Sequence, residues 1–220
     1  MNRSAAAAAL LLVVLAPRTY AQVRLSGSVS GAFIEHRVRD AGTIEASSGP
    51  VAGVRGSATI ASWIEIEAYL SGGKLKAEQL TTYDQRLTEL GTRVTVTATP
   101  WLALRAGANR RSYVAPDFAG VRWTTLQLDA EARPPLLGTA LHGLVQASLM
   151  PVVWVSGNRQ RPNMAFGAET GLEWGRHRLT AGIRYAVERY QFRTVGGQTR
   201  AEQLSSLTLR FGLRLGNREE

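Results

Sequence analysis

Apolar and polar residues alternate one by one along most of this chain. Val94 and Val96 flank Thr95, and the same rhythm continues where Leu104 precedes Arg105. A period of two residues indicates β-strands, because successive side chains of a strand point to opposite faces. After the first 21 residues no segment sustains the period of a helix. The pattern therefore predicts an all-β protein.

Short turn signals recur at a regular interval. They lie at residues 61–62, Pro100, Gly138 and Arg176, and each follows the one before by 38 residues. Extending the grid in both directions reaches Arg24 and Arg214, near the two ends of the chain. This spacing predicts five hairpins and hence ten strands, with eight strands as the second choice.

The expected strands cover residues 22–36, 51–61, 63–72, 85–99, 101–114, 121–134, 139–153, 164–174, 177–192 and 203–215. The longer connections, 37–50, 73–84, 115–120, 154–163 and 193–202, contain Gly, Pro, Asn and Ser. Long and short connections alternate, which is typical of a transmembrane antiparallel up-and-down β-barrel with short periplasmic turns and longer outer loops. A strand of about 12 residues tilted by ~45° rises about 28 Å, enough to cross the hydrocarbon layer.

The contents of the two strand faces favour a membrane barrel over a soluble β-sandwich or a lipocalin-like barrel, which also alternate. The polar face holds Ser, Thr, Gly and Arg, whereas Lys occurs only at Lys74 and Lys76 in an expected loop. Small residues and Arg suit a crowded interior, because a planar guanidinium group can pair with several acids. The other face carries no charge and comprises Val23, Leu25, Val29, Phe33, Ile64, Ile66, Ala68, Leu70, Leu126, Leu128, Ala130, Ala132, Leu141, Val145, Ala147, Leu149, Leu179, Ala181, Ile183, Tyr185, Val187, Leu207, Leu209, Phe211, Leu213 and Leu215.

Aromatic residues gather near the expected strand ends, where a membrane barrel carries interfacial girdles. Trp63, Trp101 and Trp174 lie beside short turns, and Trp123 and Trp154 lie beside loops. The aromatic residues expected to join the loop-side girdle are Tyr69, Tyr113, Tyr190 and Phe192.

The first residues form a separate segment. A basic start at Arg3 precedes an apolar run over residues 5–16, and residues 19–21 (TYA) have the small residues of a cleavage site. The run is too short to span a bilayer. Residues 1–21 are therefore expected to be a cleaved secretory signal, with an N-terminal anchor helix as the alternative. Residues 22–220 would form one barrel domain, and export without any Cys suits a bacterial envelope protein.

Charged residues of both signs recur at similar depths on the polar face. Glu169 and Arg184 lie nearly opposite each other in one expected hairpin. Because an unpaired buried charge is costly, the belt is expected to serve stability, with conduction or catalysis as the less favoured interpretation. The expected lumen charge network is Arg55, Glu67, Arg93, Arg105, Glu131, Glu169, Arg184 and Arg210.

Basic residues also recur in or beside every expected outer loop. The chain has 26 Lys plus Arg against 17 Asp plus Glu, and an exported protein seldom meets nucleic acid, so anionic lipid is the expected partner. Guanidinium groups make paired hydrogen bonds to phosphate oxygens, which predicts contact with lipopolysaccharide; a solvated basic surface is the alternative. The candidate contact residues are Arg37, Arg39, Lys74, Lys76, Arg110, Arg111, Arg159, Arg161, Arg193 and Arg200.

With this signal, strand spacing and pair of faces, the chain resembles the small outer-membrane β-barrel proteins of Gram-negative bacteria. The resemblance covers residues 22–220 and is architectural, without a family-specific motif. It implies a bacterial outer-membrane location and the barrel assembly machinery as a partner. Such proteins usually end on an aromatic residue, whereas here the strand containing Phe211 is followed by residues 217–220 (NREE).

Three functional hypotheses follow. The first is a structural or surface-interaction barrel with an occluded lumen, and the second is a narrow porin-like channel for small solutes or ions. The third is a rim hydrolase like the ten-stranded omptin proteases, whose sites use Asp and His; here His36, Asp40, Asp84 and Asp117 lie in expected outer loops. No phosphate loop, metal-ligand spacing or GxSxG motif occurs, so we expect neither a cofactor nor a metal site, and no enzyme.

Overall fold

The computed structural model describes residues 23–79, 83–115, 120–138, 140–156, 161–193 and 200–215. The expected signal segment, residues 1–21, lies outside the described residues. Within the described ranges no helix has the length and hydropathy needed to cross a membrane. The strands there are β1 (Arg24–Asp40), β2 (Thr43–Ala61), β3 (Ile64–Ala77), β4 (Gln85–Thr99), β5 (Leu102–Val114), β6 (Val121–Ala132), β7 (Pro135–Leu137), β8 (Leu141–Ser156), β9 (Pro162–Arg176), β10 (Leu179–Phe192) and β11 (Arg200–Leu215).

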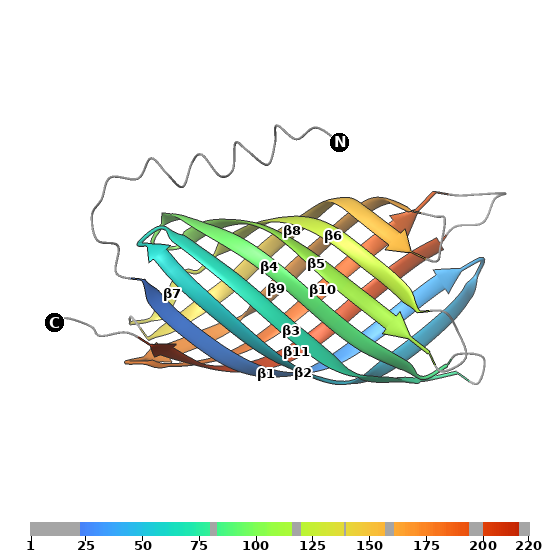
Figure 1. Cartoon of the computed structure of the whole chain (residues 1–220), viewed down its shortest axis with the longest axis horizontal. Coiled ribbons are helices and arrows are strands. Elements are labelled where there is room, and N and C mark those ends of the chain that lie inside the picture. Colours follow the sequence, from blue (N-terminus) through green and yellow to red (C-terminus); the bar gives the residue numbers. More distant parts are fainter. Residues whose placement is uncertain are drawn as a thin grey trace.

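Ten of these strands form one closed antiparallel barrel (Figure 1). Each long strand pairs with its neighbours in the chain, β1 pairs with β11, and β6 pairs with β8. The short β7 pairs only with β8 and stands outside the closed ring of ten. The expected ten-stranded up-and-down barrel is thus confirmed. Closure leaves no free edge among these ten described strands, which is what a sheet inside a bilayer requires.

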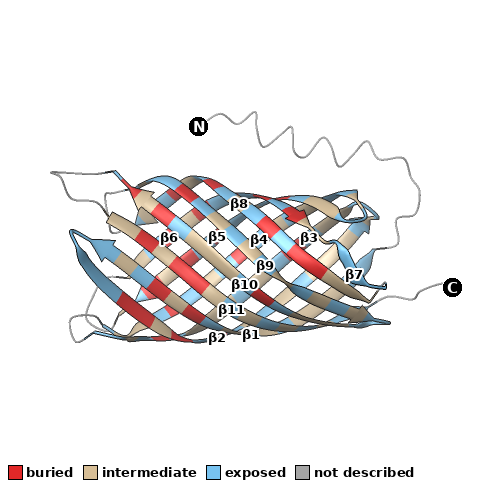
Figure 2. Cartoon of the chain, turned by 180° about the vertical axis from the view of Figure 1, so that it is seen from behind, coloured by how far each residue is buried: buried red, intermediate tan, exposed pale blue. Residues whose placement is uncertain are grey.

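The long strands expose their large apolar side chains on the outside of the barrel. Buried and exposed residues alternate along each strand (Figure 2). Leu209 and Phe211 expose 51% and 60% of their surface, and the apolar residues of the other strands behave in the same way. A band of this size would be highly unfavourable in water. The apolar face read from the sequence is therefore the outer, lipid-facing surface.

The first hairpin is longer than the sequence pattern indicated. Residues 37–50 were expected to form a loop, but β1 and β2 continue through them and pair up to Asp40 and Thr43. The two connecting residues, Ala41 and Gly42, have φ of 47° and 88°. Positive φ at both positions is the geometry of a type I′ turn, which matches the twist of a hairpin. The segment resembles a loop in sequence because it contains Gly42, Gly49 and Pro50 and lacks a sustained apolar face.

A second departure lies in the middle of β8. Pro151 cannot donate a hydrogen bond to a neighbouring strand, and the register shifts opposite it, between Leu126 and Leu128 of β6. The resulting irregularity changes the alternation, so that Met150 and Val153 are both buried inside the barrel. A Pro inside a strand is tolerated at such a bulge.

The lipid-facing band generates a prediction about insertion. Replacing Leu209, near the middle of the band, with Arg should lower the free energy of unfolding in lipid vesicles by about 2–4 kcal/mol. Leu137→Arg is the control, because that exposed residue lies in the turn-side connection and should cost about 1 kcal/mol or less. Both changes are measured by following the folded fraction against urea concentration. The folded protein is the gel band whose migration changes on boiling. Recovery of the unaltered protein as a monomer without detergent would contradict the membrane assignment.

Candidate functional site

A belt of ion pairs crosses the interior of the barrel near mid-height. Arg105 donates to Glu131 of β6 at 2.6 Å and to Gln146 of β8 at 2.8 Å. Arg55 of β2 donates to Glu67 of β3 at 2.9 Å. The Arg55–Glu67 and Arg105–Glu131 pairs each join adjacent strands, Gln146 lies one strand beyond Glu131, and all these side chains point inward. The sequence-predicted residues are thus brought together across the interior.

Arg184 is the most heavily engaged base of the β9–β10 side. Its guanidinium group donates to Glu169 at 2.8 Å and to Glu173 at 2.9 Å. Glu173 also accepts a hydrogen bond from Arg210 of β11 at 3.2 Å. Gly171 lies opposite Arg184 in the register, and a Cβ atom there would come 2.3 Å from the Ile183 carbonyl oxygen. Glycine therefore provides the space through which the Arg184 side chain reaches both acids.

Three charged residues of this belt were missed in the sequence analysis. Asp129 lies 3.8 Å from Arg93, and Arg133 donates to Glu131 at 2.6 Å. Glu173 lies four residues after Glu169 and therefore points to the same face of β9. Counting every second residue inward from Glu169 would have identified it.

A second buried charge cluster lies nearer the loop end. Arg111 donates to Glu89 at 2.9 Å and to Glu188 at 2.8 Å, and Tyr190 also donates to Glu188 at 2.7 Å. Arg111 is only 4% exposed. Its expected contact with lipopolysaccharide is therefore wrong, because on β5 it shares the inward face of Arg105, whereas Arg110 points outward.

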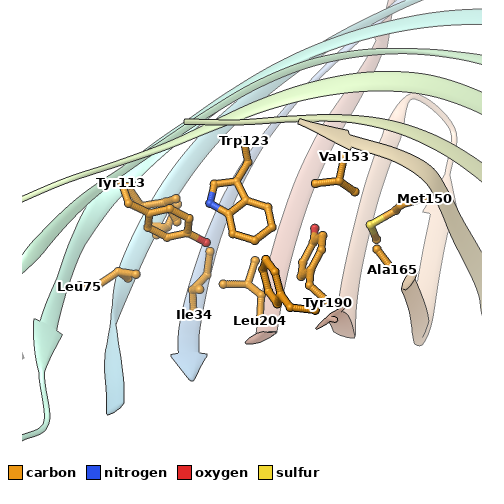
Figure 3. Packing of buried hydrophobic residues seen from close by; sticks show 12 residues of the cluster. Ile34, Leu75, Tyr113, Trp123, Met150, Val153, Ala165, Tyr190 and Leu204 are labelled. Atoms are coloured by element: carbon orange, nitrogen blue, oxygen red, sulfur yellow. The ribbon is translucent and has the colours of Figure 1, made fainter. Parts of the chain in front are cut away.

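Apolar side chains fill the interior around that cluster, in the loop-side half of the barrel. Figure 3 shows residues from opposite walls pointing toward one another, with Trp123 among them. Its ring packs edge-on against Tyr190 at 4.9 Å and Phe192 at 6.1 Å between centroids. We call this group the apolar cluster, and it comprises Ile34, Val51, Leu75, Leu87, Tyr113, Trp123, Met150, Val153, Ala165, Tyr190, Phe192 and Leu204.

The apolar cluster corrects the expected loop-side girdle. Trp123, Tyr113, Tyr190 and Phe192 are buried inside the barrel, and Tyr69 also points inward and donates to Glu89 at 3.2 Å. Trp123, Tyr113, Tyr190 and Phe192 do lie near strand ends, whereas Tyr69 lies within β3, and all five occupy the inner face and not the outer one. The Trp residues on the outer surface are Trp63, Trp101, Trp154 and Trp174.

A polar cavity of about 250 Å³ occupies the opposite, turn-side half of the interior. Arg105, Glu131 and Glu67 line its inner end, and Pro100 and Trp101 of the β4–β5 turn line its outer end. The other lining residues include Ser and Thr hydroxyl groups and further Arg side chains. The interior therefore changes from polar and hollow at the turn end to filled at the loop end, where apolar side chains pack around a few paired charges.

The loop-side rim holds a His–acid arrangement. His36 Nε2 lies 3.2 Å from Glu202 Oε2, and the His36 ring stacks on Tyr113 at 4.7 Å. Arg200 donates to Glu202 at 2.6 Å and lies 3.6 Å from Asp40. Arg200 thus points inward, and its expected contact with lipopolysaccharide is also wrong. Asp117 and Arg159 lie outside the described residues, and among those that are described no group of His, Cys, Asp and Glu could hold a metal.

The remaining basic candidates lie on the outer surface near the loop end. Lys74 forms an ion pair with Asp84 at 2.8 Å. Together with the Ala77 N–H, this contact lowers the pKa of the Asp84 carboxyl group below its usual range. The sequence analysis missed Arg86, Arg122 and Arg189, which were expected within strands. We call the exposed bases of the described residues near the loop end the basic belt. It comprises Arg37, Arg39, Lys74, Lys76, Arg86, Arg110, Arg122, Arg161, Arg189 and Arg193.

No protein-family model and no curated protein matches this sequence, but solved structures resemble its fold. The outer membrane protease OmpT from Escherichia coli aligns with a TM-score of 0.58 at 8% identity, over 91% of this chain and 99% of that chain. The translocator domain of the autotransporter NalP from Neisseria meningitidis aligns with a TM-score of 0.46 at 15% identity, over 96% of each chain. The transport unit of the autotransporter AIDA-I from Escherichia coli gives 0.48 at 10% identity, over 97% and 98%. The likeness to OmpT shows that this chain has the fold of an outer-membrane β-barrel.

The Arg184 contacts generate a stability prediction. Arg184→Ala should leave Glu169 and Glu173 under-paired and lower the free energy of unfolding by about 2–4 kcal/mol. A double-mutant cycle with Glu169→Ala separates the pair energy from the effects of the two single changes. Urea unfolding in lipid vesicles is the measurement. Additive effects of the two substitutions would mean that the contact contributes no coupling energy.

Proposed function

We propose that this protein is a structural or surface-interaction barrel of the bacterial outer membrane, with a closed interior and a basic belt that contacts lipopolysaccharide. The observation that carries the proposal is the apolar cluster, which fills the loop-side half of the interior. Here the side chains pack closely, and the cavity beside Trp123 and Tyr190 measures only about 10 Å³, room for about one water molecule and too little for a hydrated ion. The outer surface is therefore the part of the molecule available for contacts.

The charged belt supports the same proposal. Glu131 is fully buried and Arg105 is 8% exposed, so the mid-height interior is filled by paired side chains rather than open solvent. A ten-stranded barrel is little wider than an eight-stranded one, whose interior side chains suffice to fill it. Two successive layers, one ionic and one apolar, thus separate the turn-side cavity from the loop-side rim.

Conductance in planar bilayers tests the closed interior. The unaltered protein should be silent, whereas the double substitution Trp123→Ala with Phe192→Ala should open a small ion-conducting path through the apolar cluster. The matched control is Trp154→Ala with Phe166→Ala, which removes the same residue types from the outer surface and should stay silent. Stepwise conductance by the unaltered protein would contradict a closed interior, and silence of the interior variant would mean that the apolar cluster is not the barrier.

A narrow porin-like channel is the second candidate, and the turn-side cavity favours it. The cavity is lined by charges of both signs and by hydroxyl groups, as a solute path would be. It would need a continuation through the apolar cluster, and the same conductance measurement separates the two candidates.

A rim hydrolase receives less support. His36 is 8% exposed, and its ring is enclosed by Tyr113 and Glu202. Within the described residues, its imidazole makes no hydrogen bond to a hydroxyl group that could act as a nucleophile. A general base must reach the proton that it removes, so we propose a non-enzymatic role.

The basic belt supports contact with lipopolysaccharide. Its side chains leave the barrel wall just beyond the apolar band, where the phosphate groups of the outer leaflet lie. Each base near an anionic surface contributes about 1 kcal/mol, and the attraction weakens as salt increases. Guanidinium groups add paired hydrogen bonds to phosphate oxygens.

Thermal unfolding in detergent tests this contact. Added lipopolysaccharide should raise the melting temperature of the protein, and the rise should shrink as ionic strength increases. Dephosphorylated lipopolysaccharide is the control and should give a smaller rise, because it retains the acyl chains but not the phosphate charges. An equal rise with both lipids would mean that the lipid makes only apolar contacts with the barrel. The basic belt would then be a solvated surface.

A further inference from the structure

Within the basic belt, one cluster of arginines differs from the rest. Arg110 of β5 and Arg122 of β6 are both exposed on the outer surface, and Arg86 of β4 lies on the same side of the wall. The strands β4, β5 and β6 are consecutive neighbours in the sheet. These three bases therefore belong to one patch rather than to separate parts of the rim.

The strand register brings the three arginines around Ser112. Arg122 is the direct register partner of Ser112 across β5 and β6, and the Cβ atoms of such partners are about 5 Å apart. Arg110 precedes Ser112 by two residues on the same face, a rise of about 7 Å. Arg86 is the diagonal neighbour of Ser112, next to its partner Thr88, at about 7–8 Å. The three side chains are therefore long enough to reach one point on the surface above Ser112.

Hydroxyl groups fill the positions between these arginines. Thr88 and Ser112 are register partners on β4 and β5, and Thr124 is the partner of Arg110 on β6. Hydroxyl groups donate to anionic oxygens, so they complement the guanidinium groups. The outward polar residues of 85–90, 108–114 and 121–126 are three arginines and three hydroxyl residues. The neighbouring carboxylate, Asp84, is paired with Lys74, the register partner of Arg86.

The three guanidinium groups are also unpaired. Within the part of the chain that the structure describes, none of them makes a hydrogen bond or ion pair with another protein group. This separates them from Arg37, which donates to Glu35 at 2.6 Å, and from Lys74, which pairs with Asp84. Exposed Leu90 and Leu126 lie immediately below, on the membrane side of the patch. A ligand here would present phosphate oxygens to the arginines and acyl chains to the leucines.

We propose that Arg86, Arg110 and Arg122, with the hydroxyl groups of Thr88, Ser112 and Thr124, form a binding site for one phosphate group of lipopolysaccharide. The proposal rests on the proposed contact between the basic belt and lipopolysaccharide, and it narrows that contact to one site. Arginine suits the site because its planar fork binds phosphate oxygens in pairs. Ser112 lies at the centre, where the phosphate group would rest.

Lipopolysaccharide binding to the detergent-solubilised full barrel tests the site. Native mass spectrometry with purified lipopolysaccharide measures both stoichiometry and affinity, and dephosphorylated lipopolysaccharide is the matched probe. The unaltered protein should bind one lipopolysaccharide tightly and prefer the phosphorylated form. The triple variant Arg86→Gln, Arg110→Gln and Arg122→Gln should bind roughly a hundredfold more weakly, since each base contributes about fivefold.

Two further variants separate a built site from diffuse attraction. Arg39→Gln, Arg189→Gln and Arg193→Gln remove the same charge from exposed positions on β1 and at the loop end of β10. As members of the basic belt they supply only diffuse attraction, so this variant should lose much less affinity than the site variant and still bind one lipopolysaccharide. Arg86→Lys, Arg110→Lys and Arg122→Lys keep the charge but lose the paired hydrogen bonds, and this variant should bind at least about tenfold more weakly. Heat modifiability on gels shows that each variant is folded.

The outcomes also separate the two proposals. Equal losses in the two glutamine variants, or full binding by the lysine variant, would overturn the site while leaving diffuse contact with lipopolysaccharide intact. Full binding by the site variant would likewise overturn the site. If the unaltered protein did not distinguish phosphorylated from dephosphorylated lipopolysaccharide, the proposed contact itself would fall.

Discussion

A bilayer offers no hydrogen-bond partners to a peptide backbone, and this constraint governs the rest of the structure. The chain meets it by closing ten antiparallel strands into a ring through the β1–β11 and β6–β8 pairings. Closure in turn divides every strand into one lipid-facing and one interior face. Leu209 and Arg210 illustrate the result, because they are adjacent in sequence yet lie in hydrocarbon and among ion pairs respectively.

The interior face follows from the same division. Charges that point inward leave bulk water, so they must find partners, and Arg184 does so by contacting two acids of β9. Nearer the loop end the inward positions become apolar, and Trp123 packs against Tyr190 and Phe192. This layered filling of the interior supports the proposal of a closed barrel whose interactions take place on its outer surface.

The outer surface is organised by height. Apolar side chains cover the lipid-facing band, and basic side chains lie where the strands extend beyond the hydrocarbon layer toward the loops. Inward-pointing bases such as Arg111 and Arg200 form ion pairs with acids of the interior. Only the outward-pointing bases are therefore available to lipid. Arg86, Arg110 and Arg122 stand out among these because the register places the hydroxyl groups of Thr88, Ser112 and Thr124 between them.

The sequence by itself determined the all-β class, the ten strands, the turn spacing and the lipid-facing residues, because these depend on a period of two that is local to each strand. It also indicated the Glu169–Arg184 pair, whose members lie in one hairpin. Only the tertiary structure decided the continuation of β1 and β2 through residues 37–50, since that segment contains Gly and Pro and lacks a sustained apolar face. It likewise decided the inward face of Trp123 and Arg111, and the meeting of Arg86, Arg110 and Arg122 around Ser112. These features depend on the register between strands and on closure of the sheet, which no single strand encodes.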